Sequence, residues 1–537
     1  MNREIVGTVG KTVSEAVLVT IIAAVFYCTL QGQLPYHDAL RFTHQIASGL
    51  FVWDIAHILL QPTALFAYKW SGVDPVLALK MLSSLSTAVA IGLFYLLLVQ
   101  FSLTRWQAIL GSVLLAACCS VITLAPSAHP KLVAFPFING ALLCLCMAER
   151  GGMRSSRLLV LGGILLALGA SFLASVLATA PFATLAILFA SRREGATWTF
   201  ATRQSLVFAV TCGAVFAVVA CMGFIEFTGQ PLSIAGLIGS VSGKASLRPA
   251  PIPVPVHLAR VLFGTVNNLV TLPELGATVQ AWMRGQIPSL RPYLHLLPIL
   301  ALAMTAGLLV AATYLQTLRG LLRRRIPYMP VAFLLGAQTW TIWYGLNDPE
   351  HWFQLTAPTI ALFLITMPIT VVRIGLPAWV LVATTANLAL LAVPVATYPL
   401  STHESTLARM LGPTDMLVSF ASYPGRAYAG FYMLPNVRRL KLDVEIQDTG
   451  MSVENALKSI DSRIHETLQG NSRVLVADIL DPLDWEAPWM SFLSRGVTKG
   501  RLAEALMNSR TAKRLDDVGG IKLWELKNTT ATVPLQH

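Results

Sequence analysis

Long apolar stretches, separated by short polar segments, dominate the first 400 residues of the chain. They lie near residues 13–31, 78–99, 107–125, 132–148, 158–174, 176–190, 205–227, 296–316, 329–346, 355–372 and 377–399. A helix needs roughly 20 residues to cross the hydrocarbon of a bilayer, because each residue adds about 1.5 Å. The pattern therefore predicts an α-helical polytopic membrane protein with about eleven transmembrane helices. The first stretch has no small-x-small cleavage site and is expected to remain as the first helix.

Composition agrees with the pattern. The chain is 55% hydrophobic and 12% charged, against roughly 25% charged in soluble proteins, so its surplus apolar surface must face lipid. The formal net charge of +12 does not predict a nucleic-acid partner. The basic residues are concentrated in the short segments between apolar stretches, which is the positive-inside signal of membrane proteins.

The same basic segments predict the orientation. With a cytoplasmic N-terminus and eleven helices, the arginines near residues 150–157, 192–203 and 319–325 all lie in cytoplasmic segments. Merging the short stretches 158–174 and 176–190 into one helix would move Arg323–Arg325 outside, against the insertion bias. We therefore expect a multi-pass protein of a cell inner membrane, with its C-terminal part in the periplasm.

The chain divides into two predicted domains. Residues 1–400 form the transmembrane domain, with outside loops at 32–77 and 228–294, and residues 401–537 form a small soluble α/β domain. In the latter, β-like and helix-like runs alternate. The β-like runs are Met416–Phe420, Arg473–Ile479 and Ile521–Leu526, and the helix-like runs are Val453–Leu468 and Lys499–Asn508. No GxGxxG or GxxxxGK[ST] motif is present in the sequence, which argues against nucleotide binding.

Ionisable residues close to the membrane are the candidates for chemistry. A charge there costs free energy, so a residue that carries one is a candidate for a functional role. The first outside loop holds Asp38, Asp54, His57 and Lys69. Three more candidates precede later helices, namely Lys131, Glu350 and His351. All seven cysteines lie in apolar stretches, no CxxC pair occurs, and the loop histidines match no zinc spacing. We expect no metal ligands and no cofactor, although a divalent metal stays open.

The first loop has a recognisable order of motifs. An acidic residue follows the first helix, then His57, Pro62 and Gly72, and Lys80-Met-Leu-Ser opens the second helix. This order resembles the GT-C superfamily of membrane glycosyltransferases, and within it families 39 and 83, which use polyprenyl-phosphate sugars. The segment Glu350-His-Trp-Phe-Gln-Leu-Thr-Ala-Pro is similar to the one that opens a late helix in many members. The resemblance covers residues 1–400. It implies a glycosyltransferase that moves a sugar from a polyprenyl-phosphate donor to a lipid, glycan or protein acceptor on the periplasmic face.

The resemblance also implies roles for the candidate residues. Asp38 matches the catalytic first-loop Asp, and Asp54 is the second candidate for the base. Five residues are assigned to substrate binding, chiefly of the donor phosphate, and His57 among them also shapes the loop. They are His57, Lys69, Lys131, Glu350 and His351.

Structural roles are open for the same residues. Asp38 could cap a loop helix, Asp54 could pair with Lys69 or Arg41, and Lys69 beside Trp70 is typical of an interfacial anchor. At the level of the whole chain, the alternatives are a polytopic transporter and a non-catalytic envelope-assembly protein.

Overall fold

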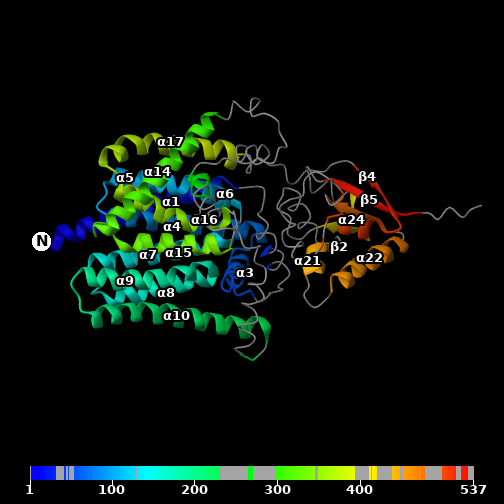
Figure 1. The fold of residues 1–537 in the computed structure, drawn as a ribbon, viewed down its shortest axis with the longest axis horizontal. Coiled ribbons are helices and arrows are strands. Elements are labelled where there is room, and N and C mark those ends of the chain that lie inside the picture. Colours follow the sequence, from blue (N-terminus) through cyan, green and yellow to red (C-terminus); the bar gives the residue numbers. More distant parts are fainter. Residues whose placement is uncertain are drawn as a thin grey trace, which may run out of the picture. The chain divides into compact units, whose positions relative to one another are not determined.

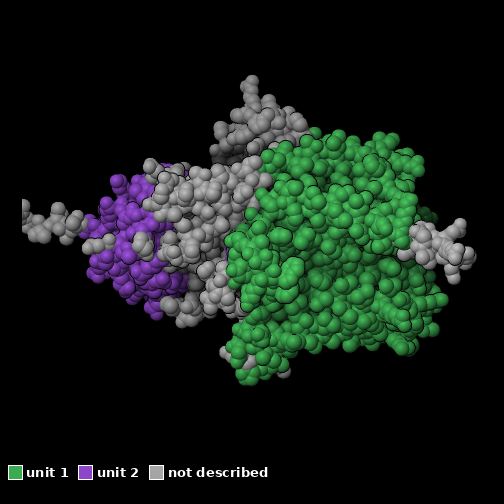
Figure 2. Space-filling model, turned by 180° about the vertical axis from the view of Figure 1, so that it is seen from behind, with its two compact units in different colours: residues 1–32, 45–246, 251–397 green, residues 33–44, 247–250, 398–537 purple. Residues whose placement is uncertain are grey.

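The computed structural model separates the chain into two compact units, which Figure 2 distinguishes by colour. Unit 1 comprises residues 1–32, 45–246 and 251–397, and unit 2 comprises residues 33–44, 247–250 and 398–537. The structure describes residues 2–31, 42–43, 46, 54–127, 130–229, 231–232, 264–269, 297–344, 349–393, 410–412, 414–419, 438–447, 452–470, 472–477, 480, 497, 499–515 and 522–529. Asp38 and the proline-rich stretch 249–255 lie outside these residues.

Unit 1 is a bundle of helices (Figure 1). In chain order they are α1 (Asn2–Thr29), α3 (Leu60–Ser71), α4 (Pro75–Gln100), α5 (Arg105–Ala117), α6 (Cys119–Leu124), η1 (Ala125–Ser127), η2 (Pro130–Ala134), α7 (Phe135–Arg150), α8 (Ser156–Phe172), η3 (Ala174–Ala178), α9 (Thr179–Arg193), α10 (Trp198–Thr228), α14 (Leu297–Leu322), α15 (Tyr328–Tyr344), α16 (Pro349–Thr366), η5 (Val371–Gly375), α17 (Leu376–Asn387) and η6 (Leu388–Ala392). Each of the eleven apolar stretches overlaps one or more of these helices.

Several helices of unit 1 have the length and the apolar composition of membrane-spanning helices. Among the described residues, five helices are long and apolar enough to cross a bilayer: Gly10–Thr29, Pro75–Gln100, Lys131–Arg150, Ala174–Arg193 and Trp198–Thr228. A sixth is added if Arg105–Ala117 and Cys119–Ser127, which meet at a bend of 56°, form one span. Eleven spans therefore remain a prediction.

Local sequence signals set the helix starts. At α4 the carboxylate of Asp74 accepts hydrogen bonds from the N–H groups of Val76 and Leu77, at 2.8 and 3.3 Å. Pro75, in the first turn, has no N–H that would need a partner. Thr104 and Gln107 form a capping box at the start of α5. These caps satisfy N–H groups that the helix itself leaves unpaired.

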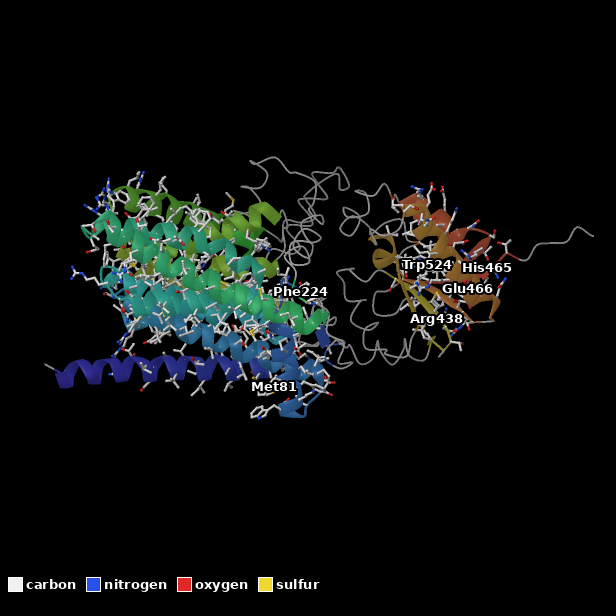
Figure 3. All side chains as sticks on the ribbon, turned by 90° about the horizontal axis from the view of Figure 1, so that it is seen from below. Met81, Phe224, Arg438, His465, Glu466 and Trp524 are labelled. Atoms are coloured by element: carbon white, nitrogen blue, oxygen red, sulfur yellow. The ribbon has the colours of Figure 1, made fainter. Side chains whose placement is uncertain are left out.

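Helix α1 lies at the edge of the bundle and packs on α4 (Figure 3). A glycine makes this approach possible, because a Cβ on Gly92 would lie 2.0 Å from Thr20 Oγ1. Small residues at such crossings let two helix backbones come close within a membrane. The outer face of α1 is exposed and apolar, with Ile22 60% exposed, as expected for a lipid-facing surface.

A buried carboxylate joins three helices at the end of the bundle where α7 and α9 finish and α15 begins. Glu149 is 3% exposed and accepts hydrogen bonds from the N–H groups of Tyr328 and Met329, at 2.8 and 3.2 Å. The guanidinium of Arg193 lies 3.2 Å from the same carboxylate and also donates to the carbonyl of Ile326 at 2.9 Å. Glu149 thus caps the start of α15 with a negative charge, where the helix dipole favours one.

The described residues of unit 2 form a five-stranded sheet and three helices. The strands are β1 (Met416–Ser419), β2 (Arg438–Lys441), β3 (Val474–Ala477), β4 (Arg510–Arg514) and β5 (Leu523–Asn528), in the order β2-β1-β3-β5-β4. β1 runs parallel to β2 and β3, and β5 runs antiparallel to β3 and β4. The helices are α21 (Leu442–Gln447), α22 (Val453–Gln469) and α24 (Lys499–Met507).

The core of unit 2 lies between one face of the sheet and these helices. Alternate residues of β1 and β3, such as Met416, Val418 and Val476, pack with Ile460 and Ile464 of α22. In Figure 3, Trp524 marks β5, and His465 and Glu466 mark α22. The three β-like and two helix-like runs expected from the sequence match β1, β3, β5, α22 and α24, whereas β2, β4 and α21 were not predicted.

Candidate functional site

A tight turn in the first loop holds two of the candidate residues. The Asp54 side chain accepts a hydrogen bond from the N–H of Ala56 at 2.9 Å, and the Asp54 carbonyl accepts one from the N–H of His57 at 2.9 Å. An aspartate commonly forms such a turn because its side chain can imitate a backbone acceptor. Asp54 and His57 are 8% and 6% exposed, so the turn holds both side chains away from solvent.

The turn docks on the C-terminal end of α8. The Nδ1 atom of His57 lies 2.9 Å from the carbonyl oxygen of Phe172, and the N–H of Leu59 donates to the carbonyl of Ser171 at 3.1 Å. Because a carbonyl can only accept, Nδ1 carries the proton in this pair. The last carbonyls of a helix have no partner within it, so the turn and α8 satisfy each other. His57 is therefore hydrogen-bonded within the fold, and its role in the loop stays a prediction.

Lys131 lies at the same end of unit 1. It belongs to η2, which packs on α4 and α8 and leads directly into α7. At the start of α7 the ring of Phe137 stacks on that of Phe172, with centroids 5.2 Å apart. Lys131 is 6% exposed, and a lysine so buried needs anionic or hydrogen-bonding neighbours.

The start of α16 also belongs to this end. Gln354 donates to the hydroxyl of Ser175 in η3 at 2.7 Å, and the ring of Phe353 lies edge-on to Phe135 at 5.4 Å. Glu350 and His351 occupy the first turn of α16, but their side chains lie outside the described part. The turn at Asp54 and the start of α16 thus both contact the junction of α8 and η3, and η2, which carries Lys131, packs on α8.

Lys69 lies elsewhere on the first loop, on a groove between α3 and α10. The groove has a volume of about 1170 Å³ and is lined on one side by Pro62, Phe66, Lys69 and Trp70, and on the other by Met222 and Glu226. Lys69 follows the exposed face of α3, whereas His57 precedes the helix and is buried. Of the candidates whose side chains are described, Lys69 is the one that the structure does not place in the buried group.

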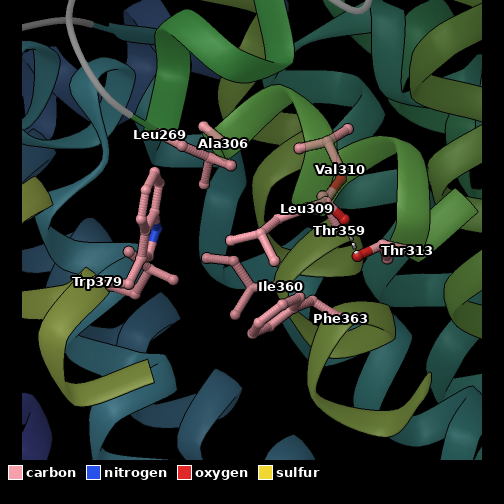
Figure 4. A pocket seen from close by; sticks show the side chains of 10 residues that line it. Leu269, Ala306, Leu309, Val310, Thr313, Thr359, Ile360, Phe363 and Trp379 are labelled. Atoms are coloured by element: carbon pink, nitrogen blue, oxygen red, sulfur yellow. Dashed lines mark hydrogen bonds between the residues drawn. The ribbon is translucent and has the colours of Figure 1, made fainter. Parts of the chain in front are cut away.

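A second hollow lies inside the bundle between α14, α16 and α17 (Figure 4). Its volume is about 30 Å³, and its walls include Leu309, Ile360, Phe363 and Trp379. A space of this size holds a water molecule or two and has no room for a sugar. We regard it as a packing defect.

Buried amides near the bend between α5 and α6 were not found from the sequence. The Asn268 side chain accepts from the N–H of Ser120 at 2.8 Å and donates to the hydroxyl of Thr356 in α16. Asn387 donates to the carbonyls of Ala117 and Leu269, at 2.7 and 3.1 Å. Within a membrane, the backbone N–H and C=O groups that a break in a helix leaves free need hydrogen-bond partners inside the protein. For Asn387, its place within the apolar stretch 377–399 was the available signal, because burial of an amide is costly unless it is paired. Asn268 lies in the segment expected to be an outside loop and gave no such signal.

Among the described residues, no three His, Cys, Asp or Glu side chains form a group that could hold a metal ion. The seven cysteines are all free thiols. The described residues at this end of unit 1 include a carboxylate (Asp54), an imidazole (His57) and an ammonium group (Lys131), and all three are buried.

Comparison with known proteins finds no matching family model and no matching curated sequence, but several solved structures share the fold. ArnT from Cupriavidus metallidurans in the apo state aligns over 97% of this chain and 98% of its own, with 11% identity and a TM-score of 0.50. The oligosaccharyltransferase from Archaeoglobus fulgidus, in complex with Zn and sulfate, aligns over 96% of this chain and 74% of its own, with 14% identity and a TM-score of 0.50. ArnT bound to undecaprenyl phosphate aligns over 98% of both chains, with 10% identity and a TM-score of 0.48.

Proposed function

Because the chain has the fold of the GT-C superfamily of membrane glycosyltransferases, we propose that it transfers a sugar from a polyprenyl-phosphate donor to an acceptor. The acceptor is a lipid, a glycan or a protein. In this proposal the chain spans an inner membrane eleven times with its N-terminus in the cytoplasm. The reaction takes place on the periplasmic face, where residues 401–537 form a soluble α/β domain.

The observation that carries the proposal is the alignment with ArnT over nearly the whole of both chains, together with the buried Asp54, His57 and Lys131 at one end of unit 1. ArnT has also been solved with undecaprenyl phosphate bound, which supports a polyprenyl-phosphate donor. Fold alone does not define a reaction, so the residues must supply the chemistry.

The reaction needs a base and a cation. The base takes the proton of the acceptor hydroxyl, the hydroxyl oxygen attacks the anomeric carbon, and the bond from that carbon to the phosphate oxygen breaks. An ionised aspartate suits the first role, and we assign it to Asp38, with Asp54 as the second candidate. Direct displacement with one base inverts the anomeric configuration.

A cation must stabilise the negative charge that develops on the leaving phosphate. We assign this role first to Lys131, because burial strengthens its attraction to a phosphate. Glu350 and His351 at the start of α16 are assigned to donor binding. The hydrogen bond from His57 to Phe172 gives that histidine a positioning role.

A transfer assay tests the proposal. Purified wild type and three variants, Asp38→Asn, Asp54→Asn and Lys131→Gln, are incubated with a panel of polyprenyl-phosphate sugars and extracted envelope lipids, and released polyprenyl phosphate is measured. Loss of a general base typically reduces rate by about 10²–10⁴-fold, and we expect this for Asp38→Asn. Lys131→Gln should lower kcat by about 10²-fold or more.

The matched control is Asp74→Asn, which makes the same change in the same loop. Asp74 caps α4, and asparagine caps equally well, so this variant should keep full activity. A folded Asp38→Asn protein with wild-type turnover would remove Asp38 from the mechanism. Absence of turnover with every donor would argue against the glycosyltransferase itself.

A further inference from the structure

The groove between α3 and α10 has the character of a lipid site. Phe66 and Trp70 on α3 are 69% and 81% exposed, and Met222 on α10 is 66% exposed. All three line the groove. Met222 belongs to α10, which is long and apolar enough to cross a bilayer, so lipid chains have access to a hollow of about 1170 Å³.

Two opposite charges line the same groove. Lys69 lies in the last turn of α3, and Glu226 lies two residues before the end of α10 at Thr228. In the part of the chain that the structure describes, neither side chain forms a hydrogen bond or an ion pair. A ligand that carries one negative and one positive group would satisfy both.

The helix ends add to this selectivity. The groove lies beside the C-terminal turns of both α3 and α10, where the helix dipole is equivalent to about half a negative charge. A head group with phosphate alone would be attracted by Lys69 but repelled by Glu226 and by the helix ends. An added ammonium group reverses that repulsion.

We propose that this groove binds a phospholipid with an amine-bearing head group, drawn from the surrounding bilayer. Its phosphate lies by Lys69, its ammonium lies by Glu226, and an acyl chain follows the apolar wall of α10. This site is separate from the proposed transfer reaction and does not depend on it. Ile58 and Leu59 of the groove wall directly follow His57, so a bound lipid braces the turn that holds Asp54.

Lipid-dependent thermal unfolding of the purified full chain in detergent tests the site. Phosphatidylethanolamine, phosphatidylglycerol and phosphatidylcholine are titrated separately, and the shift in unfolding midpoint gives an apparent affinity for each. Wild type should bind phosphatidylethanolamine most tightly. Glu226→Gln should weaken the binding of phosphatidylethanolamine by about threefold and strengthen that of phosphatidylglycerol, because it removes the repulsion of the phosphate. Lys69→Gln should weaken the binding of both lipids, since one exposed ion pair contributes up to about 1 kcal/mol.

The controls make the same changes at other exposed positions. Lys11→Gln on α1 and Glu194→Gln at the end of α9 should leave the lipid preference unchanged. The charge-swapped double variant, Lys69→Glu with Glu226→Lys, should recover the preference for phosphatidylethanolamine. The inference is overturned if wild type binds the three lipids equally, or if Glu226→Gln leaves the preference intact. It is also overturned if polyprenyl phosphate displaces phosphatidylethanolamine with the same affinity in wild type and Glu226→Gln.

Discussion

At the residue scale, Gly336 sets how closely α15 approaches the start of α9. A Cβ at this position would lie 2.5 Å from the Cα of Thr179, and a backbone atom cannot move aside as the end of a flexible side chain can. We expect Gly336→Ala to lower the free energy of unfolding by about 1–3 kcal/mol, as overpacking does in protein interiors. Thermal unfolding of the purified protein in detergent measures it.

Gly213 offers the matched control. It also lies inside a helix, α10, but a Cβ there would meet nothing within 4 Å. Gly213→Ala should be neutral or stabilising by up to about 1 kcal/mol, because alanine has the higher helix propensity. Equal effects of the two substitutions would show that close contact at Gly336 is not what matters.

Glu149 is a second residue on which the packing of helices in unit 1 depends, at the junction of α7, α9 and α15. Its carboxylate accepts hydrogen bonds from the backbone N–H groups of Tyr328 and Met329 in α15 and also pairs with the guanidinium of Arg193. Glu149→Ala leaves these donors without their partner and should reduce stability by about 3–5 kcal/mol. Glu149→Gln keeps an acceptor oxygen and should reduce stability less than Glu149→Ala does. If unfolding midpoints of both variants match wild type, the three-helix junction does not depend on this residue.

Sequence reasoning singled out His57 as a candidate but missed Glu149, and the reason is distance along the chain. His57 lies in a loop whose polar residues were already candidates. Glu149 follows an apolar stretch next to Arg150 and reads as one more charge at a membrane boundary. Its N–H partners lie about 180 residues away, and no local pattern shows which helix start comes to rest above it.

At the element scale, Asp415 and Arg473 join the starts of β1 and β3. The carboxylate accepts hydrogen bonds from the Arg473 N–H at 3.0 Å and from its guanidinium at 2.7 Å, and from the N–H of Gly412 at 2.7 Å. Burial alone raises the pKa of Asp415, but the hydrogen bonds from Gly412 and Arg473 together outweigh it and lower the pKa below its usual range.

This lowered pKa predicts how unit 2 responds to acid. The unfolded chain binds a proton at the higher pKa, about 3.9 for an aspartate, so the contribution to stability is fully present above that pH. It is lost as pH falls through the folded pKa. Hydrogen exchange of β1 and β3 in the full chain, corrected for intrinsic rates, should show this loss in wild type. In Asp415→Asn, the protection of β1 and β3 from hydrogen exchange should already be lower at neutral pH. It should not fall further in this acid range.

The control for Asp415 is Glu454, whose carboxylate is 75% exposed and lies 3.7 Å from Arg501. An exposed pair of this kind contributes little, so Glu454→Gln should exchange like wild type at every pH. Exchange in Asp415→Asn that follows wild type through the acid range would contradict the assignment.

The elements that the sequence predicted are those with a strong hydrophobic period of their own. The apolar stretches of unit 1 became helices, and α22 has the pattern of a one-sided helix, with Ile460 and Ile464 buried. The edge strands β2 and β4 read Arg-Arg-Leu-Lys and Arg-Thr-Ala-Lys-Arg, which carries no strand signal. They are strands because β1 and β5 offer open edges for pairing, and basic residues are common on such edges.

At the scale of the whole molecule, the orientation of the chain in the membrane decides on which face the candidate residues work. The charge distribution predicts that the end of α9 is cytoplasmic and that α3 and unit 2 are outside. Three exposed positions report on these places: Glu194 after α9, Ser71 at the end of α3, and Glu466 in α22. Each is replaced by cysteine in turn.

Labelling of intact cells with a membrane-impermeant maleimide then reads the topology. The background carries Cys28→Ser and Cys221→Ser, because the other five native thiols are buried. We expect Ser71→Cys and Glu466→Cys to react in intact cells, and Glu194→Cys to react only after permeabilisation. Since each span moves the next segment of the chain to the opposite side of the membrane, a protected Glu466→Cys beside a reactive Ser71→Cys would mean an odd number of spans missing or added between them. Residues 401–537 would then lie in the cytoplasm, where they could not act on an acceptor that binds at the first outside loop on the other face.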